Sequence, residues 1–184
     1  DTMGYTTLKI TVGDSSKASK PVDISSLENQ YYSIDIDTRK GVVSSIFDKQ
    51  LEIDLVDQKD TLTLGQFVYE QLNNRHQLEP LTKTTRDTIY EPLGLKRTKL
   101  TNIKLISHES GNIYNSIVLN GNMPYCADNR GVNIEIRLYH YQKKIELLYS
   151  MHKLAVTDPE GVYITFPFKL DHGELAYEAQ GGVV

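Results

Sequence analysis

The sequence predicts an all-β domain, organised as a large antiparallel β-sandwich. Apolar and polar residues alternate in one segment after another, which is the period of strands with one buried face. Helical periodicity is scarce, and most of the alternating segments are joined by short polar turns that suit antiparallel neighbours. Strands of about ten residues favour a sandwich over a small barrel, and 184 residues are enough to bury a full core.

The first residues are expected to precede the sandwich itself. Residues 1–13 alternate from Leu8 to Val12, which predicts the last strand of a preceding domain. Residues 14–24 are rich in Ser, Lys and Pro and have no apolar period, as is typical of an exposed linker. The β-sandwich domain is therefore expected over residues 25–184, truncated at its C-terminus because the chain stops without a polar tail.

A β-hairpin between residues 31 and 48 is the clearest local signal. Ile34 and Ile36 alternate with polar neighbours, and Gly41 provides the positive φ that a short hairpin loop usually needs. After this turn, Val43 and Phe47 fall on alternate positions. We therefore expect them to share one face of the second strand.

The middle of the chain predicts a less regular series of elements. Residues 65–70 predict a strand, and residues 73–81 allow a turn or two of helix before Pro80 intervenes. Residues 89–93, which contain Pro92, predict an edge strand or a loop.

The remaining segments predict a run of strands. The segment 132–141 alternates most cleanly, and the segment 145–154 follows it so closely that only an antiparallel hairpin connects them. Inward-facing side chains are expected at Val132, Ile134, Ile136 and Leu138. Ile117 and Leu119 are expected to share one face of a strand, and further strands are expected over residues 100–107 and around Val162, Ile164 and Phe166.

Composition excludes two classes of partner. The net charge is −4 and the basic residues are scattered, so we expect no nucleic-acid partner. No apolar run approaches the roughly 20 residues that span a bilayer, so we expect no membrane partner. Cys126 is the single cysteine, which excludes an internal disulfide, and we expect it to be a small, semi-buried residue.

The hairpin and the strands after it resemble a known family. Leu27-Glu28-Asn29 with Tyr32 matches LEN-x-x-Y, residues 41–49 match G-x-x-S-S-I-x-D-K, and residues 65–70 match G-Q-F-x-Y-E. These words, in this order, are similar to the start of the C-terminal β-domain of the family 38 glycoside hydrolases, the α-mannosidases. Further short segments that are similar to strands of this family lie in the expected order at residues 3–7, 134–139, 144–146 and 162–168.

The resemblance implies a fold, a substrate and a cofactor. The implied fold is a supersandwich of the galactose-mutarotase-like type, which packs against an N-terminal catalytic domain of the same chain. The implied reaction is hydrolysis of α-mannosides with retention, using zinc held by two His and two Asp, an Asp nucleophile and a second carboxylic acid. The five histidines begin no His-x-Asp or His-Glu-x-x-His motif. We therefore expect no catalytic residue, no metal ligand and no cofactor in this chain, which should be inactive alone.

One loop is the candidate for substrate binding. Tyr69 and Glu70 end a predicted strand, and Asn74 and Arg75 follow in a dense polar stretch. Loops at strand ends often carry binding groups, and the family resemblance implies that the β-domain lends residues to the edge of the active site. Tyr69 would stack on a sugar, while Glu70, Asn74 and Arg75 would bind its hydroxyls; an ordinary solvated loop is the alternative.

Two other functions stay open. The chain is also compatible with a carbohydrate-binding or structural sandwich of another multidomain enzyme, although the absence of Trp weakens the reading as a lectin. A small enzyme of mutarotase type would need a His and a Glu, and His140 or His152 with Glu135 or Glu146 are the candidates. The two histidines are expected on facing strands of one hairpin, where they come close.

Overall fold

The computed structural model describes residues 25–72 and 95–170, together with two short strands near the C-terminus. These residues form antiparallel strands with one 3₁₀ turn, Ala127–Asn129, so the predicted all-β class is confirmed. The predicted strand in residues 1–13, the linker and the elements expected in residues 73–81 and 89–93 lie outside the described residues. Among the described residues, no helix has the length and apolar character needed to cross a membrane.

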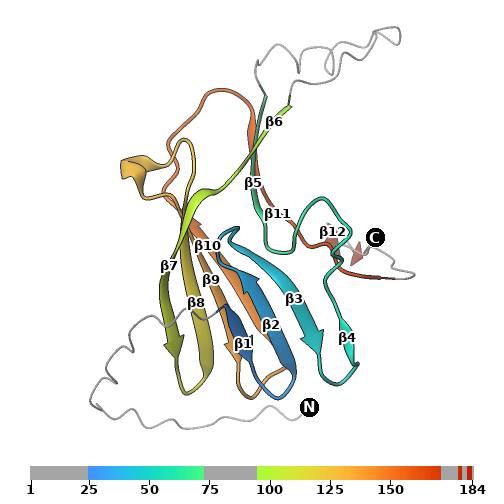
Figure 1. Cartoon of the computed structure of the whole chain (residues 1–184). Helices are drawn as coiled ribbons and strands as arrows, with labels where there is room; N and C mark the ends of the chain where they lie inside the picture. Colours follow the sequence, from blue (N-terminus) through green and yellow to red (C-terminus); the bar gives the residue numbers. More distant parts are fainter. Residues whose placement is uncertain (1–24, 73–94, 171–177, 180–181, 184) are drawn as a thin grey trace, which may run out of the picture.

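The strands are arranged in three main sheets (Figure 1). The first sheet has the order β1-β2-β3-β4, the second β10-β9-β8-β7 and the third β11-β5-β6, and each neighbouring pair is antiparallel. The strands are β1 (Ser26–Glu28), β2 (Tyr32–Asp37), β3 (Val42–Asp48), β4 (Ile53–Asp54), β5 (Phe67–Leu72), β6 (Leu95–Lys99), β7 (Thr101–Ser110), β8 (Tyr114–Asn122), β9 (Val132–Tyr139), β10 (Ile145–Met151), β11 (Glu160–Ile164), β12 (Glu178–Ala179) and β13 (Gly182–Val183).

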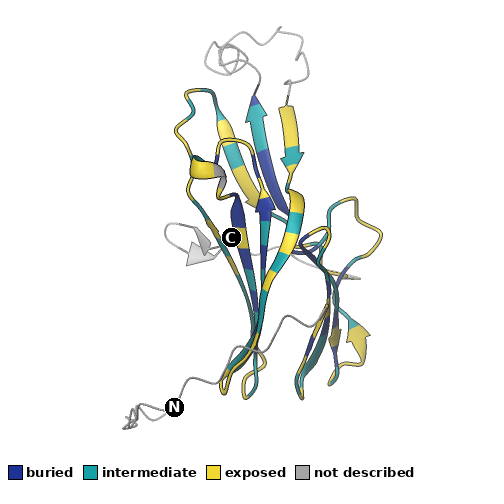
Figure 2. Ribbon diagram, turned by 60° about the vertical axis from the view of Figure 1, so that its left-hand side comes forward, coloured by how far each residue is buried: buried dark blue, intermediate teal, exposed yellow. Residues whose placement is uncertain are grey.

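The first and second sheets face each other and enclose the main core (Figure 2). Ile34 and Ile36 from β2 pack in the same cluster as Ile134, Ile136 and Leu138 from β9. These side chains are at most 3% exposed. The inward alternation predicted for β9 is confirmed, and the two facing sheets make the β-sandwich. The finer expectation of a mutarotase-like supersandwich stays a prediction.

A second core joins the third sheet to one end of the sandwich. Phe67 and Tyr69 from β5 pack with Met123, Cys126 and Val132, which lie at the same end of the second sheet. Burial raises the pKa of the Cys126 thiol, as expected for a cysteine that serves as a small core residue. Figure 1 shows β6 continuing into β7, so the third sheet extends from the second.

The predicted faces of β3 are wrong in one detail. Val43 is buried as expected, but Phe47 is 40% exposed and Ile46 is buried in its place. The register between β2 and β3 shifts between Asp35 and Ile36, where Asp35 pairs with Ser45 and Ile36 with Val43. This β-bulge adds one residue to β3, and an added residue exchanges the two faces of the strand beyond it.

A buried carboxylate ties the first sheet to the β9–β10 turn. Asp48 is 2% exposed, and its Oδ1 accepts hydrogen bonds from the backbone N–H of Gln50 at 2.9 Å and of Leu51 at 3.1 Å. The Nζ of Lys143 lies 2.7 Å from the other carboxylate oxygen. The Lys143 ammonium, assisted by these N–H groups, holds the pKa of Asp48 below its ordinary value.

This lowered pKa predicts a loss of stability in acid. In the folded state, the Asp48 carboxylate takes up a proton at a lower pH than it does in the unfolded chain. Its contribution to stability is therefore fully present above the unfolded pKa and is lost as the pH falls through the folded pKa. We expect Asp48→Asn to lower stability at pH 7 and to flatten its decline below about pH 4. Urea denaturation at several pH values measures both effects. The control is Asp35→Asn, an exposed site on β2; equal acid slopes for D48N and the wild type would contradict the prediction.

Candidate functional site

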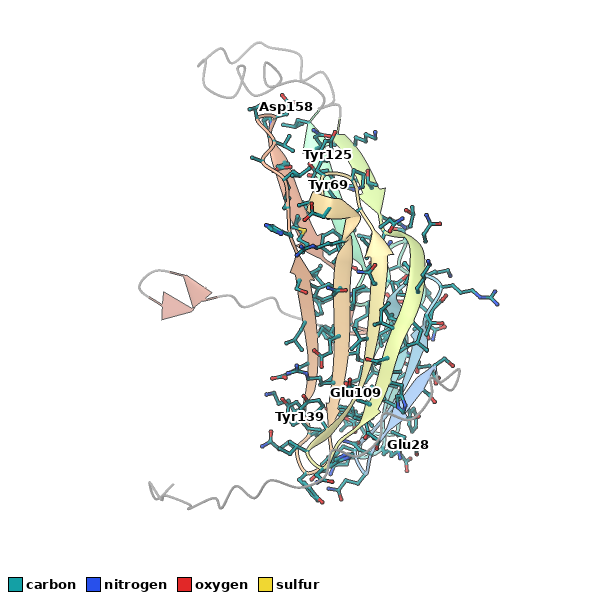
Figure 3. All side chains as sticks on the ribbon, turned by 90° about the vertical axis from the view of Figure 1, so that its left-hand side faces the viewer. Glu28, Tyr69, Glu109, Tyr125, Tyr139 and Asp158 are labelled. Atoms are coloured by element: carbon teal, nitrogen blue, oxygen red, sulfur yellow. The ribbon has the colours of Figure 1, made fainter. Side chains whose placement is uncertain are left out.

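The end of β5 contains the two described members of the predicted binding loop, and Tyr69 is buried there. Its side chain is 1% exposed, its hydroxyl donates to Oε2 of Glu160, and its ring lies 5.8 Å from the ring of Tyr125. Figure 3 shows Tyr69 and Tyr125 at one end of the sandwich, close to Asp158. The stacking expected of Tyr69 finds no open ring face, because the second core and Tyr125 enclose the side chain.

Tyr69 belongs to a three-residue polar group that the sequence did not predict. Lys153 Nζ lies 2.5 Å from Oε1 of Glu160 and 5.8 Å from the centre of the Tyr69 ring. Lys153 and the Tyr69 hydroxyl together lower the pKa of Glu160. Burial, and then the hydrogen bond to Glu160, raise the pKa of Tyr69, so the phenol stays protonated at neutral pH. The group orients β5, β11 and the segment after β10, and it holds no free acid or base.

Glu70 points to the other face of the third sheet, because successive side chains of a strand alternate. Its Oε2 accepts a hydrogen bond from Nε of Arg97 at 2.6 Å, across the β5–β6 pair. The side chain of Arg97 is 64% exposed, which leaves its other N–H groups open to a ligand. Asn74 and Arg75 lie outside the described residues. The described part of the site is thus Glu70 with Arg97, a residue that the sequence did not indicate.

The histidines expected to approach each other are far apart, and that prediction is wrong. Val132 pairs with Met151 and Leu138 pairs with Ile145, so His140 follows one end of the β9–β10 hairpin and His152 follows the other. Two residues come close across a hairpin only when the register sets them opposite. Nε2 of His140 instead contacts the carbonyl oxygen of Gly111 at 2.8 Å.

The two glutamates of the mutarotase hypothesis are held by cations. Arg137 donates from Nε and Nη2 to both carboxylate oxygens of Glu135, at 2.6 and 2.9 Å. Glu146 is paired with Lys144 and accepts the hydroxyl of Tyr139 at 2.7 Å. The Lys144 ammonium, followed by Tyr139, lowers the pKa of Glu146. A carboxylate kept ionised in this way is a poor general acid.

The described residues do not fit a zinc site. Within residues 25–72 and 95–170, no group of three or more His, Cys, Asp or Glu side chains is arranged to hold a metal ion. A catalytic zinc needs three such ligands and an open position. No catalytic step through a metal is therefore derived from this part of the chain.

Together, the two cores and the internally paired polar groups define an antiparallel β-sandwich domain. Residues 27–184 match the family model described as Glycosyl hydrolases family 38 C-terminal domain. The chain therefore belongs to glycoside hydrolase family 38, as the C-terminal domain of such a protein. Comparisons with curated proteins and with solved structures gave no match.

Proposed function

We propose that this domain is the C-terminal β-sandwich of a zinc-dependent, retaining α-mannosidase. The family match over residues 27–184 carries the proposal. Hydrolysis with retention needs two carboxyl groups about 5 Å apart, one ionised and one protonated. Two neighbouring carboxylates of the second sheet, Glu135 and Glu146, are instead bound to cations. We accordingly assign the nucleophile, the acid and the zinc ligands to an N-terminal catalytic domain of the same protein.

In this proposal the sandwich packs against the catalytic domain and completes the edge of its active site. The exposed guanidinium of Arg97, oriented by Glu70, suits hydrogen bonding to the hydroxyls of a mannoside. Asn74 and Arg75 follow directly after β5 in the sequence, and we propose that they extend the same edge.

The activity is tested on the full-length gene product. A chromogenic α-mannoside should be hydrolysed, the first-formed sugar should keep the α-configuration by NMR, and chelation of zinc should abolish turnover. The 184-residue chain alone should give no hydrolysis. Hydrolysis by this chain alone, or a full-length protein that binds mannose without cleaving α-mannosides, would overturn the proposal. The second result would favour a carbohydrate-binding or structural sandwich of another enzyme.

The edge role predicts a binding defect in Glu70→Gln. The amide keeps the shape of the side chain but loses the charge that orients Arg97, and a hydrogen bond to a charged group is worth enough to change binding roughly tenfold. We therefore expect KM for the α-mannoside to rise by about that factor with kcat little changed.

Glu109→Gln serves as the matched control, because Glu109 is an exposed glutamate at the far end of the sandwich (Figure 3). An unchanged KM in E70Q, or the same rise in E109Q, would remove Glu70 from the site.

A further inference from the structure

A polar cavity lies where the three sheets meet, and its lining includes neither Glu70 nor Arg97. Its volume is about 400 Å³, within the range of sites for small ligands. The β2–β3 turn, the segment before β5 and the junction of β6 with β7 form its walls. The lining residues that matter for binding are Arg39, Lys40, Thr63, Gln66 and Lys99, with Val42, Phe67 and Leu100 as the apolar wall.

Gln66 lines this cavity with its side-chain amide. The residue is 7% exposed, and its Oε1 accepts a hydrogen bond from the backbone N–H of Thr63 at 3.2 Å. Because only the oxygen can accept, this bond settles which end of the amide is which. The Nε2 group is then left as a donor, with no acceptor among the described residues, at the wall of the cavity. A ligand oxygen in the cavity would be positioned to accept a hydrogen bond from it.

Three cations surround the same space. Lys40 has one carboxylate partner, Asp37, at 3.4 Å, and within the described ranges neither Arg39 nor Lys99 has an ion pair. Oδ1 of Asp37 also accepts the backbone N–H groups of Arg39 and Lys40, both at 3.0 Å, which orders the turn. No carboxylate lines the cavity in the described part of the chain. The lining is therefore rich in donors and positive charge, although the whole chain has a net charge of −4.

The β2–β3 turn is held firmly in place beside the cavity. Gly41 has φ +64°, a conformation that favours glycine, and a Cβ there would lie 3.0 Å from Cδ1 of Ile103 on β7. The turn thus packs closely on the second sheet. Arg39 and Lys40 extend from a backbone that is already fixed before any ligand binds, which reduces the entropic cost of binding.

We propose that this cavity binds an oxyanion of the phosphate or sulfate type, carried by a molecule the size of a monosaccharide. Cationic and amide donors without a competing carboxylate select a multiply charged oxyanion. The apolar wall of Val42, Phe67 and Leu100 suits the C–H face of a sugar ring. This inference stands apart from the proposed mannosidase activity, because it uses no residue of that site.

Isothermal titration of the 184-residue chain with three probes tests the proposal. Glucose 6-phosphate should bind, neutral glucose should not, and added NaCl should weaken the binding because exposed charges are screened. Inorganic phosphate distinguishes the source: binding of phosphate as tight as that of glucose 6-phosphate assigns the site to the free ion, and weaker binding assigns it to an anionic sugar. No binding of either anion at millimolar concentration, or equal binding of glucose, would overturn the proposal.

Two variants locate the binding. Gln66→Glu keeps the acceptor for Thr63 but replaces the N–H donors with charge that repels an anion, and Lys99→Gln removes one exposed cation. Each should weaken binding of glucose 6-phosphate roughly tenfold or more. Lys96→Gln, on the same strand but outside the cavity, is the matched control and should bind like the wild type.

Thermal unfolding checks that each variant is folded, and Lys99→Gln carries the test if Gln66→Glu does not fold. Wild-type affinity in K99Q, or an equal loss in K96Q, would place the anion elsewhere.

Discussion

Gly131→Ala is expected to destabilise the sandwich by roughly 3 kcal/mol or more, through left-handed strain and overpacking together. Gly131 has φ +67°, and a Cβ there would lie 2.2 Å from the carbonyl oxygen of Gly121 on β8. The obstacle is backbone, which cannot rotate away as a side chain does. To remove this overlap between the new Cβ and the carbonyl oxygen, β8 and β9 would have to separate where Gly121 pairs with Val132.

Urea denaturation of G131A measures this loss. The matched control is Gly161→Ala on β11, where φ is not in the left-handed region and the three atoms nearest to the new Cβ belong to the side chain of Tyr163. That ring is 52% exposed and free to move, so the control should lose less than about 1 kcal/mol. Equal stability of the two variants would show that the β8–β9 connection yields more easily than its geometry implies.

Ile136→Ala is expected to cost about 2–5 kcal/mol, the range for deleting a buried aliphatic side chain. Ile136 is 1% exposed and lies on β9 between Ile117 of β8 and Leu147 of β10. Its side chain is part of the cluster that joins the first and second sheets. Truncation leaves a cavity between two sheets whose strands are each held by backbone hydrogen bonds, so the walls can close only partly.

Ile106→Ala is the control for this truncation. Ile106 is in β7 of the same sheet, but its side chain is 55% exposed, so little apolar surface returns to water. We expect a change below about 1 kcal/mol. Chemical denaturation of both variants distinguishes the cases, and equal losses would mean that Ile136 does not belong to a tightly packed core.

Local pattern predicted most of the strands. The alternation of β9, the position of the β2–β3 turn and the buried faces of Ile117 and Leu119 all follow from residues adjacent in the chain. The face of Phe47 was missed, because the bulge between Val43 and Ser45, earlier in the same strand, has no clear local signal. β6 was also missed as a separate strand. Only one residue separates β6 from β7, yet β6 pairs in the third sheet and β7 in the second, and this change of partner has no local signal.

The candidate sites were predicted less well than the fold. Tyr69 and Glu70 are adjacent in sequence, yet one is buried against Glu160 and the other pairs with Arg97 on the opposite face. Arg97 is 27 residues and Glu160 91 residues from these partners. Such separations exceed the range of any periodic pattern.

By itself, the sequence determined the class of the domain, its best strands and its family, because strand periodicity and short motifs are properties of neighbouring residues. Only the tertiary structure decided the pairing order of the three sheets, the separation of His140 from His152, and the meeting of Gln66 with Arg39 and Lys99 around one cavity. The physical reason is that sheet pairing and burial depend on contacts between distant segments. Those contacts form in the folded chain, where register and packing, rather than sequence spacing, set which side chains are neighbours.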